Sequence, residues 1–533
     1  MEVDCIPFRE TGYFSTLICD YLDEHENLKP FYNRFPHLQN FQPQINEKKA
    51  NYATSHRKVL VETLNRQYKG FQVSKLTQEN IAALESEDSF TITTGHQLNI
   101  FTGPLYFLYK IVSTINLSRK LKKEYPKYQF VPVYWMATED HDFDEINHFN
   151  FEGKKIAWDR AASGVVGELD TQDMDKVLKA FSADLGEGQR ADELVTLFRR
   201  AYLEHNNLAD ATRFLVNELF GDIGLVIVDG NDTALKKLLI PYIKQDVFEQ
   251  IPYKKVSEAI VGLTGVSSEY NIQVNPREIN YFYLREGLRE RIVRKDEGFH
   301  VVNTKLSFTK AQLEKEMDGY PERFSPNVIA RPLFQEVILP NLCYIGGGGE
   351  LAYWLELKPY FEAMDVTFPM LLLRNSVLLL TEKQKGKVER LDLKVSDLFL
   401  KQHLLAEKKV RDISDVDIDF SPQKQLLENQ FQNLYQLAEK TDKSFLGAVK
   451  AQEVKQKKGL DVLEKRLLKA QKRKLQDHVK RTRDMQDVLF PNQSLQERQL
   501  NFSKFYLEMG DNLIPTLLEK LDPLKQDFLI LRY

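Results

Sequence analysis

The residues best placed to do chemistry form an acidic block with a histidine, Glu139-Asp140-His141-Asp142. The block follows an almost wholly apolar run, 130–137, which is typical of a sheet strand covered on both faces. Crowded carboxylates resist joint ionisation, so the pKa of some of them should rise. The block therefore predicts either a general base or an oxygen-rich site for a divalent cation such as Mg²⁺. A solvated helix start, where acidic residues are also favoured, would give the same pattern.

A zinc site made by His141 and His148 is the weaker metal alternative, because their spacing matches no zinc signature. We therefore assign no side chains to a resident metal.

A second candidate site is the polar break Thr94-Gly95-His96-Gln97, between a β-type run at 89–93 and a helical pattern from Pro104. In open α/β sheets, ligands bind where strands end and helices begin, and the N–H groups of a helix start hold anions. The break predicts an anion or nucleotide site that also includes Asn99 and Gly103. A buried histidine making one hydrogen bond is the alternative.

A third candidate is the glycine run 346–349, which stands between a β-type run at 341–345 and a helical pattern that begins near Glu350. Glycines allow the backbone to approach a ligand closely, although the run lacks the G-x-G-x-x-G spacing of a dinucleotide fingerprint. The predicted binding set here is listed as Gly347, Gly348, Gly349, Glu350, Tyr353 and Trp354, with Arg374 after the last apolar run. We read Cys343 as a small apolar strand residue rather than a nucleophile.

The elements that must position these residues alternate between strands and helices, which indicates an α/β fold. Apolar runs predict five core strands, at 89–93, 130–137, 224–228, 341–345 and 368–374. We expect a helical segment packed on the core at 1–87, core parts at 88–150, 221–254 and 331–380, a first insertion at 151–220, a second insertion with β-hairpins at 255–330, a coiled coil at 381–500, and C-terminal helices returning to the core at 501–533.

The coiled coil is predicted from Leu427, Phe431, Leu434 and Ala438, which recur at steps of four and three. The basic stretch 469–483 lies in the same region, and a solvated helix face explains it more economically than RNA binding does.

The length, net charge and cysteine content of the chain limit the kinds of protein that it can be. The chain has 533 residues, a formal net charge of -4 and three cysteines without paired spacing. These values argue against a disulfide framework and against a global attraction to nucleic acid or membrane. With no apparent signal peptide and no run long enough to span a bilayer, a cytoplasmic protein of two or three domains is expected.

With these residues in view, the chain resembles the bacillithiol-biosynthesis cysteine-adding enzymes, a family of cysteine ligases. The resemblance rests on Thr94-Gly95-His96-Gln97, Thr102-Gly103-Pro104-Leu105-Tyr106, Tyr109-Lys110, Pro132-Val133, Trp135, Glu139-Asp140-His141-Asp142, Glu145-Ile146-Asn147-His148, Gly347, Gly349-Glu350, Tyr353-Trp354 and the coiled coil. Their order and spacing extend over nearly the whole chain.

The resemblance implies a Rossmann-like core similar to class I aminoacyl-tRNA synthetases, with two inserted connecting segments and a coiled coil that forms a homodimer. It implies a ligase that joins L-cysteine to the amine of glucosaminyl-malate, the last step of bacillithiol biosynthesis. Because a carboxylate is a poor acyl donor, we expect ATP as the activating cosubstrate, with Mg²⁺ as its companion.

On this hypothesis His96, Gln97 and the helix start stabilise phosphate charge, and Asp140 or Asp142 orients the sugar amine or accepts its proton, with His141 beside them. The glycine run and Glu350 would hold the ribose or the malyl sugar. Two alternatives stay open. One is another ATP-using amide ligase or nucleotidyl transferase on the same core, and the other is an RNA- or protein-binding module acting through the coiled coil.

Overall fold

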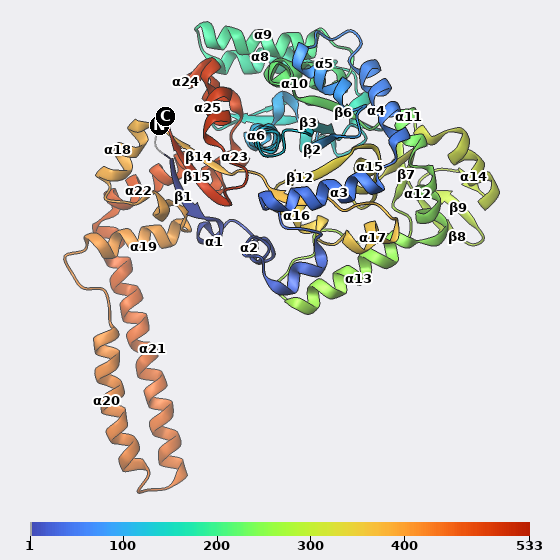
Figure 1. Ribbon diagram of the computed structural model, residues 1–533. Helices are drawn as coiled ribbons and strands as arrows, with labels where there is room; N and C mark the ends of the chain where they lie inside the picture. The colour runs from blue at the N-terminus through green and yellow to red at the C-terminus, as the bar shows by residue number, and fades with distance from the viewer. Residues whose placement is uncertain (1–2) are drawn as a thin grey trace. The chain divides into compact units, whose positions relative to one another are not determined.

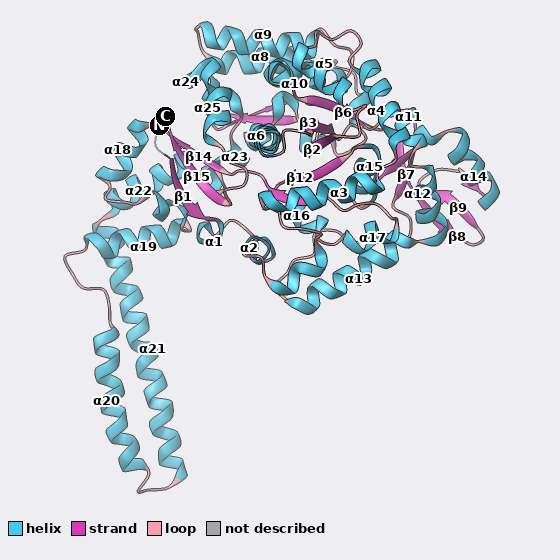
Figure 2. Cartoon of the chain, viewed as in Figure 1, coloured by secondary structure: helices cyan, strands magenta, loops and turns pink. Residues whose placement is uncertain are grey.

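The computed structural model describes residues 3–533 (Figures 1 and 2). The chain divides into two compact units. One contains residues 3–378 and 496–531, and the other contains residues 379–495 and 532–533. Each unit is described by itself below.

The larger unit is built on a five-stranded parallel sheet with the order β13-β12-β2-β3-β6. Its strands are β2 (Ser89–His96), β3 (Gln129–Met136), β6 (Val226–Asp229), β12 (Asn341–Gly346) and β13 (Met370–Leu373). The predicted α/β class is thereby confirmed. β2 extends to His96, beyond the predicted 93, because Thr94, Gly95 and His96 keep pairing with β3.

The strand order places the first strand of the sheet, β2, between β3 on one side and β12 on the other. The chain adds β3 and β6 in one direction, then returns to β2 and adds β12 and β13 in the other. Ligands of doubly wound sheets bind at this reversal, outside the carboxyl ends of the strands.

Helices cover the sheet because each offers it an apolar stripe. α6 (Tyr106–Glu124) packs along β2 and β3, and α3 (Phe41–Asn51) packs against β12. A core cluster joins these elements, and it consists of Phe41, Ile45, Phe90, Ile92, Leu117, Leu121, Tyr128, Phe130, Leu342, Cys343, Ile345, Met370 and Leu372. Cys343 is fully buried in this cluster as one of its apolar residues. α4 (Thr54–Gln67) and α5 (Lys75–Ala83) pack near β6.

The first inserted segment begins earlier than the predicted residue 151, because β4 (His148–Phe151) forms a hairpin with β5 (Lys154–Ala157). It continues into α8 (Met174–Leu185), α9 (Gln189–Leu203) and α10 (Leu208–Phe220). Phe101, from the turn after β2, packs against Phe149, Phe181 and Phe198 of this segment. The turn beside β2 is therefore fixed by apolar contacts with the insertion.

After β6 come α11 (Thr233–Lys237), α12 (Ile240–Lys244) and α13 (Ile251–Val266). The second inserted segment then forms an antiparallel sheet, order β10-β9-β8-β7-β11. Its strands are β7 (Tyr281–Arg285), β8 (Leu288–Lys295), β9 (Gly298–Val301), β10 (Ser307–Phe308) and β11 (Phe324–Pro326), with α14 (Lys310–Gly319) between the last two. The chain returns to the parallel sheet through α15 (Ala330–Ile338), and α16 (Gly348–Trp354) and α17 (Lys358–Ala363) follow β12.

The two ends of the chain differ from the prediction of helices alone. β1 (Val3–Pro7) pairs antiparallel with β15 (Asp527–Arg532), which in turn neighbours β14 (Val377–Leu380). Before β15, α24 (Phe502–Met509) and α25 (Leu513–Lys520) are helical, and α25 packs against α6. The strands escaped the pattern analysis because their partners are more than 500 residues apart, so neither shows a hairpin signal.

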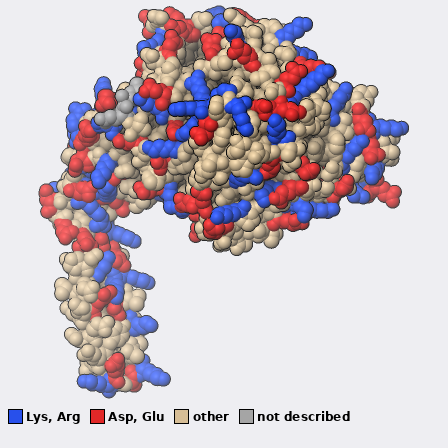
Figure 3. All heavy atoms as spheres, in the orientation of Figure 1, with Lys and Arg blue, Asp and Glu red and all other residues tan. Residues whose placement is uncertain are grey.

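The smaller unit contains α18 (Glu382–Arg390), α19 (Gln402–Ile413), α20 (Ser421–Ala438), α21 (Lys443–Lys474) and α22 (Gln476–Leu489). α20 and α21 form a long antiparallel hairpin, since residue 424 pairs with 464, 428 with 457 and 435 with 453. α21 runs through Gly459 without a break. Figure 3 shows stretches of uncharged surface along this hairpin.

Among the described residues, no helix is both long enough and apolar enough to cross a membrane.

Candidate active site

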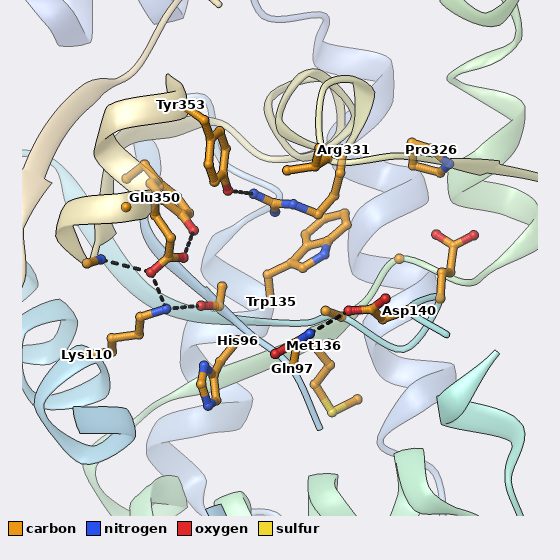
Figure 4. A pocket seen from close by; sticks show the side chains of 18 of the residues that line it. His96, Gln97, Lys110, Trp135, Met136, Asp140, Pro326, Arg331, Glu350 and Tyr353 are labelled. Carbon is orange, nitrogen blue, oxygen red and sulfur yellow. Dashed lines mark hydrogen bonds and ion pairs between the residues drawn. The ribbon is translucent and has the colours of Figure 1, made fainter. Parts of the chain in front are cut away.

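A cavity of about 530 Å³ lies at the carboxyl ends of the parallel strands, where the strand order reverses (Figure 4). All five strands lead into it, through Gln97 after β2, Ala137–Asp140 after β3, Gly230 after β6, Gly347 after β12 and Arg374 after β13. The second insertion supplies Arg289 and Pro326, and α15 supplies Arg331. This convergence makes the cavity the candidate active site.

An ion pair between the buried Lys110 and the half-buried Glu350 joins the two loops at the reversal point. The Lys110 Nζ lies 2.5 Å from Glu350 Oε2 and donates to the Gly95 carbonyl at 2.7 Å. Glu350 also accepts from the Gly347 N–H at 2.8 Å and from the Tyr344 hydroxyl at 2.6 Å. Burial would raise the pKa of Glu350, but Lys110 and these donors hold it well below its usual value. Glu350 is therefore ionised and occupied by protein donors.

The glycine run forms the start of α16 rather than an open loop. Gly348 is the first residue of this helix, and Glu350 in its first turn bonds back to the Gly347 N–H. The side chains of Tyr344 and Trp354 stack at 4.6 Å behind it. Gly347 and Gly349 face the cavity, whereas Gly348 does not line it.

Asp140 lies on the opposite side of the cavity from Lys110 and Glu350 (Figure 4). Its carboxylate accepts from Gln97 Nε2 at 2.7 Å and from the His141 backbone N–H at 2.7 Å. Burial alone would raise the pKa of Asp140, but the hydrogen bonds from His141 and Gln97 and the charge of Arg289 hold it well below the usual range. Asp140 is thus a fixed negative charge at neutral pH.

The acidic block does not act as the carboxylate cluster that its sequence suggested. Glu139 turns inward and pairs with the fully buried Lys236 at 2.6 Å, while the exposed Asp142 precedes α7 (Phe143–Ile146). His141 is also exposed, where its Nδ1 lies 2.7 Å from Arg289. The block predicted a raised pKa for some of its carboxylates, and Asp140 is not one of them, because its pKa is lowered. No group of three or more His, Cys, Asp or Glu in residues 3–533 is arranged to hold a metal ion.

His96 ends β2 and lines the cavity, but it is almost completely buried among Tyr106 and Phe107. Burial, with the neighbouring charge of Lys110, lowers the pKa of His96 to about 3. Its Nε2 has no hydrogen-bond partner among the described residues. The side chain is a neutral imidazole, so it offers one hydrogen bond rather than a positive charge.

Arg374 and the segment 496–501 close one side of the cavity. Arg374 Nη2 donates to Glu497 at 2.7 Å, and both side chains are buried. Glu497 also accepts from the Val377 N–H at 3.0 Å. The next residue, Arg498, lines the cavity mouth. Residues 496–500, expected at the end of the coiled coil, belong to the larger unit because of these contacts.

The structure thus brings together ten of the predicted site residues, namely Gly95, His96, Gln97, Glu139, Asp140, Gly347, Gly349, Glu350, Tyr353 and Arg374. Seven others do not line the cavity, and these are Thr94, Asn99, Gly103, His141, Asp142, Gly348 and Trp354.

Three of the seven hold the strand-to-helix turn. The Thr94 hydroxyl donates to the Ile345 carbonyl, the Asn99 amide donates to the Glu145 carbonyl, and Asn501 donates to the Gly103 carbonyl. Their contacts shape the walls of the site.

Several lining residues were not among the predicted site residues, namely Tyr106, Lys110, Trp135, Arg289, Arg331, Tyr344 and Arg498. Lys110 had a detectable signal, because a lysine on the apolar face of a helix is rarely buried without a partner. Arg289, Arg331 and Arg498 come from segments far apart in the chain, and no local pattern marks them.

Comparison with known proteins gives two matches to family models. Residues 1–375 match the N-terminal Rossmann-like domain of bacillithiol biosynthesis BshC, and residues 377–533 match the C-terminal coiled-coil domain of the same family. The Rossmann-like core and the coiled coil expected from the sequence are therefore confirmed.

Curated relatives of the same family match most or all of this chain. A protein of Christiangramia forsetii named "Putative cysteine ligase BshC" is 58% identical and covers 100% of this chain and 99% of its own. Proteins of the same name from Flavobacterium johnsoniae and Bacillus cereus are 57% and 30% identical, and cover 100% and 84% of this chain and 100% and 86% of their own.

A solved structure from Campylobacter jejuni, titled as a putative arginyl-tRNA synthetase, aligns over 84% of this chain and 98% of its own at 10% identity. The TM-score of this alignment is 0.21.

Proposed function

This chain belongs to the bacillithiol-biosynthesis BshC family and is a ligase, and we propose that it joins the carboxyl of L-cysteine to the amine of glucosaminyl-malate with ATP as cosubstrate. ATP would convert the cysteine carboxylate to an acyl adenylate, releasing pyrophosphate, or to an acyl phosphate, releasing ADP. The sugar amine then attacks the acyl carbon, so that a C–N bond forms, AMP or phosphate leaves, and the amine loses one proton.

The observation that carries this proposal is the separation of charge across one cavity at the reversal of the sheet. Asp140 stands on one side as a fixed carboxylate, and the cationic Arg331, beside Tyr353, lines another part of the cavity (Figure 4). Substrates that carry both amines and acidic groups can be oriented by such a site, because each end attracts the opposite charge.

Asp140 is assigned the role of binding and orienting an amine. Its depressed pKa makes it a poor acceptor for a proton, because general bases work best with a pKa near the operating pH. Gln97 holds the carboxylate at 2.7 Å and is itself held by Glu145 at 2.8 Å. Of the two earlier alternatives, orientation is therefore favoured over proton transfer.

His96 and the backbone of Gly349, in the first turn of α16, are assigned to the activated carboxyl or the phosphates. A neutral His96 donates or accepts one hydrogen bond at the unpartnered Nε2. Mg²⁺ would come with ATP and take phosphate oxygens as ligands. Lys110 and Glu350 fix the distance between the two loops and do not need to contact substrate.

The proposed enzyme is a homodimer through the α20–α21 hairpin. Large apolar side chains are exposed along it, including Leu426 (63%), Leu437 (53%) and Leu463 (52%). A second hairpin of the same kind would cover this apolar surface, as in other antiparallel helical assemblies.

The test is to incubate the purified full chain with L-cysteine, glucosaminyl-malate and Mg²⁺-ATP and to search for bacillithiol by mass spectrometry. The proposal predicts product with one AMP or one ADP per amide bond, and the nucleotide names the activation chemistry. A folded protein that consumes no nucleotide and makes no product under these conditions would contradict it.

A further inference from the structure

The cavity holds more positive charge than its own carboxylates neutralise. Five cationic side chains line it, Lys110, Arg289, Arg331, Arg374 and Arg498, against the three carboxylates of Glu139, Asp140 and Glu350. Lys110 is paired with Glu350, Arg374 with Glu497, and Glu139 with Lys236. Asp140 is then the one lining carboxylate left to face the three remaining arginines.

Arg331 is the most enclosed of these three arginines. Its guanidinium donates to the Tyr353 hydroxyl at 3.3 Å and to Gln335 at 3.2 Å, and it lies over the Tyr344 ring at 5.8 Å. All three are neutral groups, and no ion pair of Arg331 is found among residues 3–533. Figure 4 shows its side chain reaching towards the Tyr353 hydroxyl at the edge of the cavity. Arg331 is therefore a positioned cation without a counter-ion.

Arg374 offers a second unpartnered donor in the same cavity. Its two terminal nitrogens are used by Glu497, Ser376 and the Asn375 carbonyl, but the buried Nε has no acceptor among the described residues. A Cβ added at Gly347 would lie 3.8 Å from this Nε, so the donor is next to the glycine loop. An N–H that is buried without an acceptor costs free energy, unless a ligand supplies the acceptor.

Arg498 completes the group at the cavity mouth. It is exposed and forms no ion pair within the described part of the chain, and its backbone is anchored on either side by the buried Glu497 and Asn501. Arg374 lies 4.9 Å from the Tyr106 ring. Tyr106, Arg374 and Arg498 all line the cavity, so both arginines are available to the same ligand.

We propose that Arg331, the Arg374 Nε and Arg498 form an oxyanion subsite that binds a carboxylate or phosphate group of a substrate. Guanidinium groups suit both oxyanions because they present donors in a planar fork. The assignment deepens the proposed function and rests on it for the identity of the substrate, either the malyl carboxylates of the acceptor or the phosphates of ATP. The positive charge itself does not depend on which reaction occurs.

The test measures binding without catalysis, by isothermal titration of the full chain with malate and with pyrophosphate. Arg331→Gln and Arg498→Gln are compared with Arg119→Gln, which removes an exposed arginine of α6 outside the cavity. We expect Arg331→Gln to weaken one probe roughly 10- to 100-fold, Arg498→Gln to weaken the same probe less because Arg498 is exposed, and Arg119→Gln to have no effect. Arg331→Lys keeps the charge but loses the fork, so it should give partial recovery.

Which of the two probes binds more weakly to the variants identifies the substrate whose oxyanion the subsite holds. Weakened malate binding assigns the subsite to the acceptor, and weakened pyrophosphate binding assigns it to the nucleotide. Binding of both probes by Arg331→Gln and Arg498→Gln at wild-type affinity, with unchanged far-UV circular dichroism, would overturn the subsite, as would a wild-type chain that binds neither probe. If the two variants lose probe binding but the wild-type chain fails the ligation assay, the subsite stands and the proposed reaction is overturned instead.

Discussion

Asp140 shows how a few hydrogen bonds can reverse the effect of burial on a carboxylate. Three acidic residues within four positions suggested mutual repulsion, but the turn after β3 sends them in three directions. Glu139 reaches Lys236, Asp142 faces solvent, and Asp140 collects donors from Gln97 and His141. The sequence predicted which block would enter the site. It could not predict the ionisation of each member, because that depends on partners brought by other strands.

The ion pair between Lys110 and Glu350 should contribute to the stability of the fold. Replacing Lys110 by Met leaves the half-buried Glu350 without its cation, and since breaking a fully buried pair costs about 3–5 kcal/mol, this change should cost somewhat less. We expect Lys110→Met to lower Tm by several degrees, measured by circular dichroism. Lys120→Met is the matched control on the same helix, because its pair with Asp522 is largely exposed. Equal Tm values for the two variants would contradict this role.

The buried Asp246, which does not line the cavity, should make the stability of the fold depend on pH. Burial raises the pKa of Asp246 to about 7, and although one oxygen accepts from the Asn280 N–H at 2.9 Å, the other has no partner among the described residues. The folded-state pKa lies above the unfolded value, so the folded chain holds the proton more tightly and loses stability as pH rises from about 4 towards 7.

Asp246→Asn removes this titration and keeps an acceptor for Asn280. The variant should be more stable than the wild type at pH 8, by roughly 1–3 kcal/mol, and the difference should shrink at pH 5. Thermal unfolding of both proteins at the two pH values measures it. A difference that is the same at pH 5 and pH 8 would refute the raised pKa.

At the scale of elements, the turn from β2 to α6 depends on an unusual backbone. Phe101, Thr102 and Gly103 all have positive φ, and Asn501 donates to the carbonyls of Phe101 and Gly103. A Cβ at Gly103 would lie 2.6 Å from the Asn99 Cβ, closer than packing allows. The predicted importance of Gly103 thus comes from its backbone rather than from ligand contact.

Gly103→Ala should therefore lower both Tm and any ligase rate. Gly70→Ala is a matched control, because Gly70 also has positive φ but nothing within 4 Å of an added Cβ. We expect Gly103→Ala to be about 1–3 kcal/mol less stable than Gly70→Ala, from the clash alone. Indistinguishable thermal unfolding of the two variants would show that the turn relaxes freely.

The elements also show where sequence patterns stop being informative. The parallel strands were predictable because buried strands read as continuous apolar runs bounded by polar loops. The β1–β15 pairing and the approach of Arg498 were not, since each depends on contacts between residues far apart in sequence. Most of the lining residues come from strand ends and the helices that follow them, which have a local signature, and a smaller part comes from the second insertion and the C-terminal segment, which have none.

At the scale of the whole molecule, the proposed homodimer gives a direct prediction. Leu463→Asp places a charge on the exposed apolar surface of the α20–α21 hairpin, so it should convert a dimer to a monomer in sedimentation velocity experiments. Val261→Asp is the control, because Val261 is 71% exposed on α13 and lies outside the hairpin. A Leu463→Asp protein that sediments as the wild type does would exclude this surface as the dimer contact.

Asp140 is proposed to act on substrate in a cysteine-ligating cavity, and this role is tested by comparing the ligation rates of Asp140→Asn and Asp142→Asn. Both changes remove one negative charge from the same turn, but Asp140 lines the cavity and Asp142 is exposed outside it. With L-cysteine, glucosaminyl-malate and Mg²⁺-ATP, we predict at least a roughly 100-fold lower rate for Asp140→Asn, corresponding to about 2.7 kcal/mol, and a near wild-type rate for Asp142→Asn. Full activity in a folded Asp140→Asn protein would contradict the account.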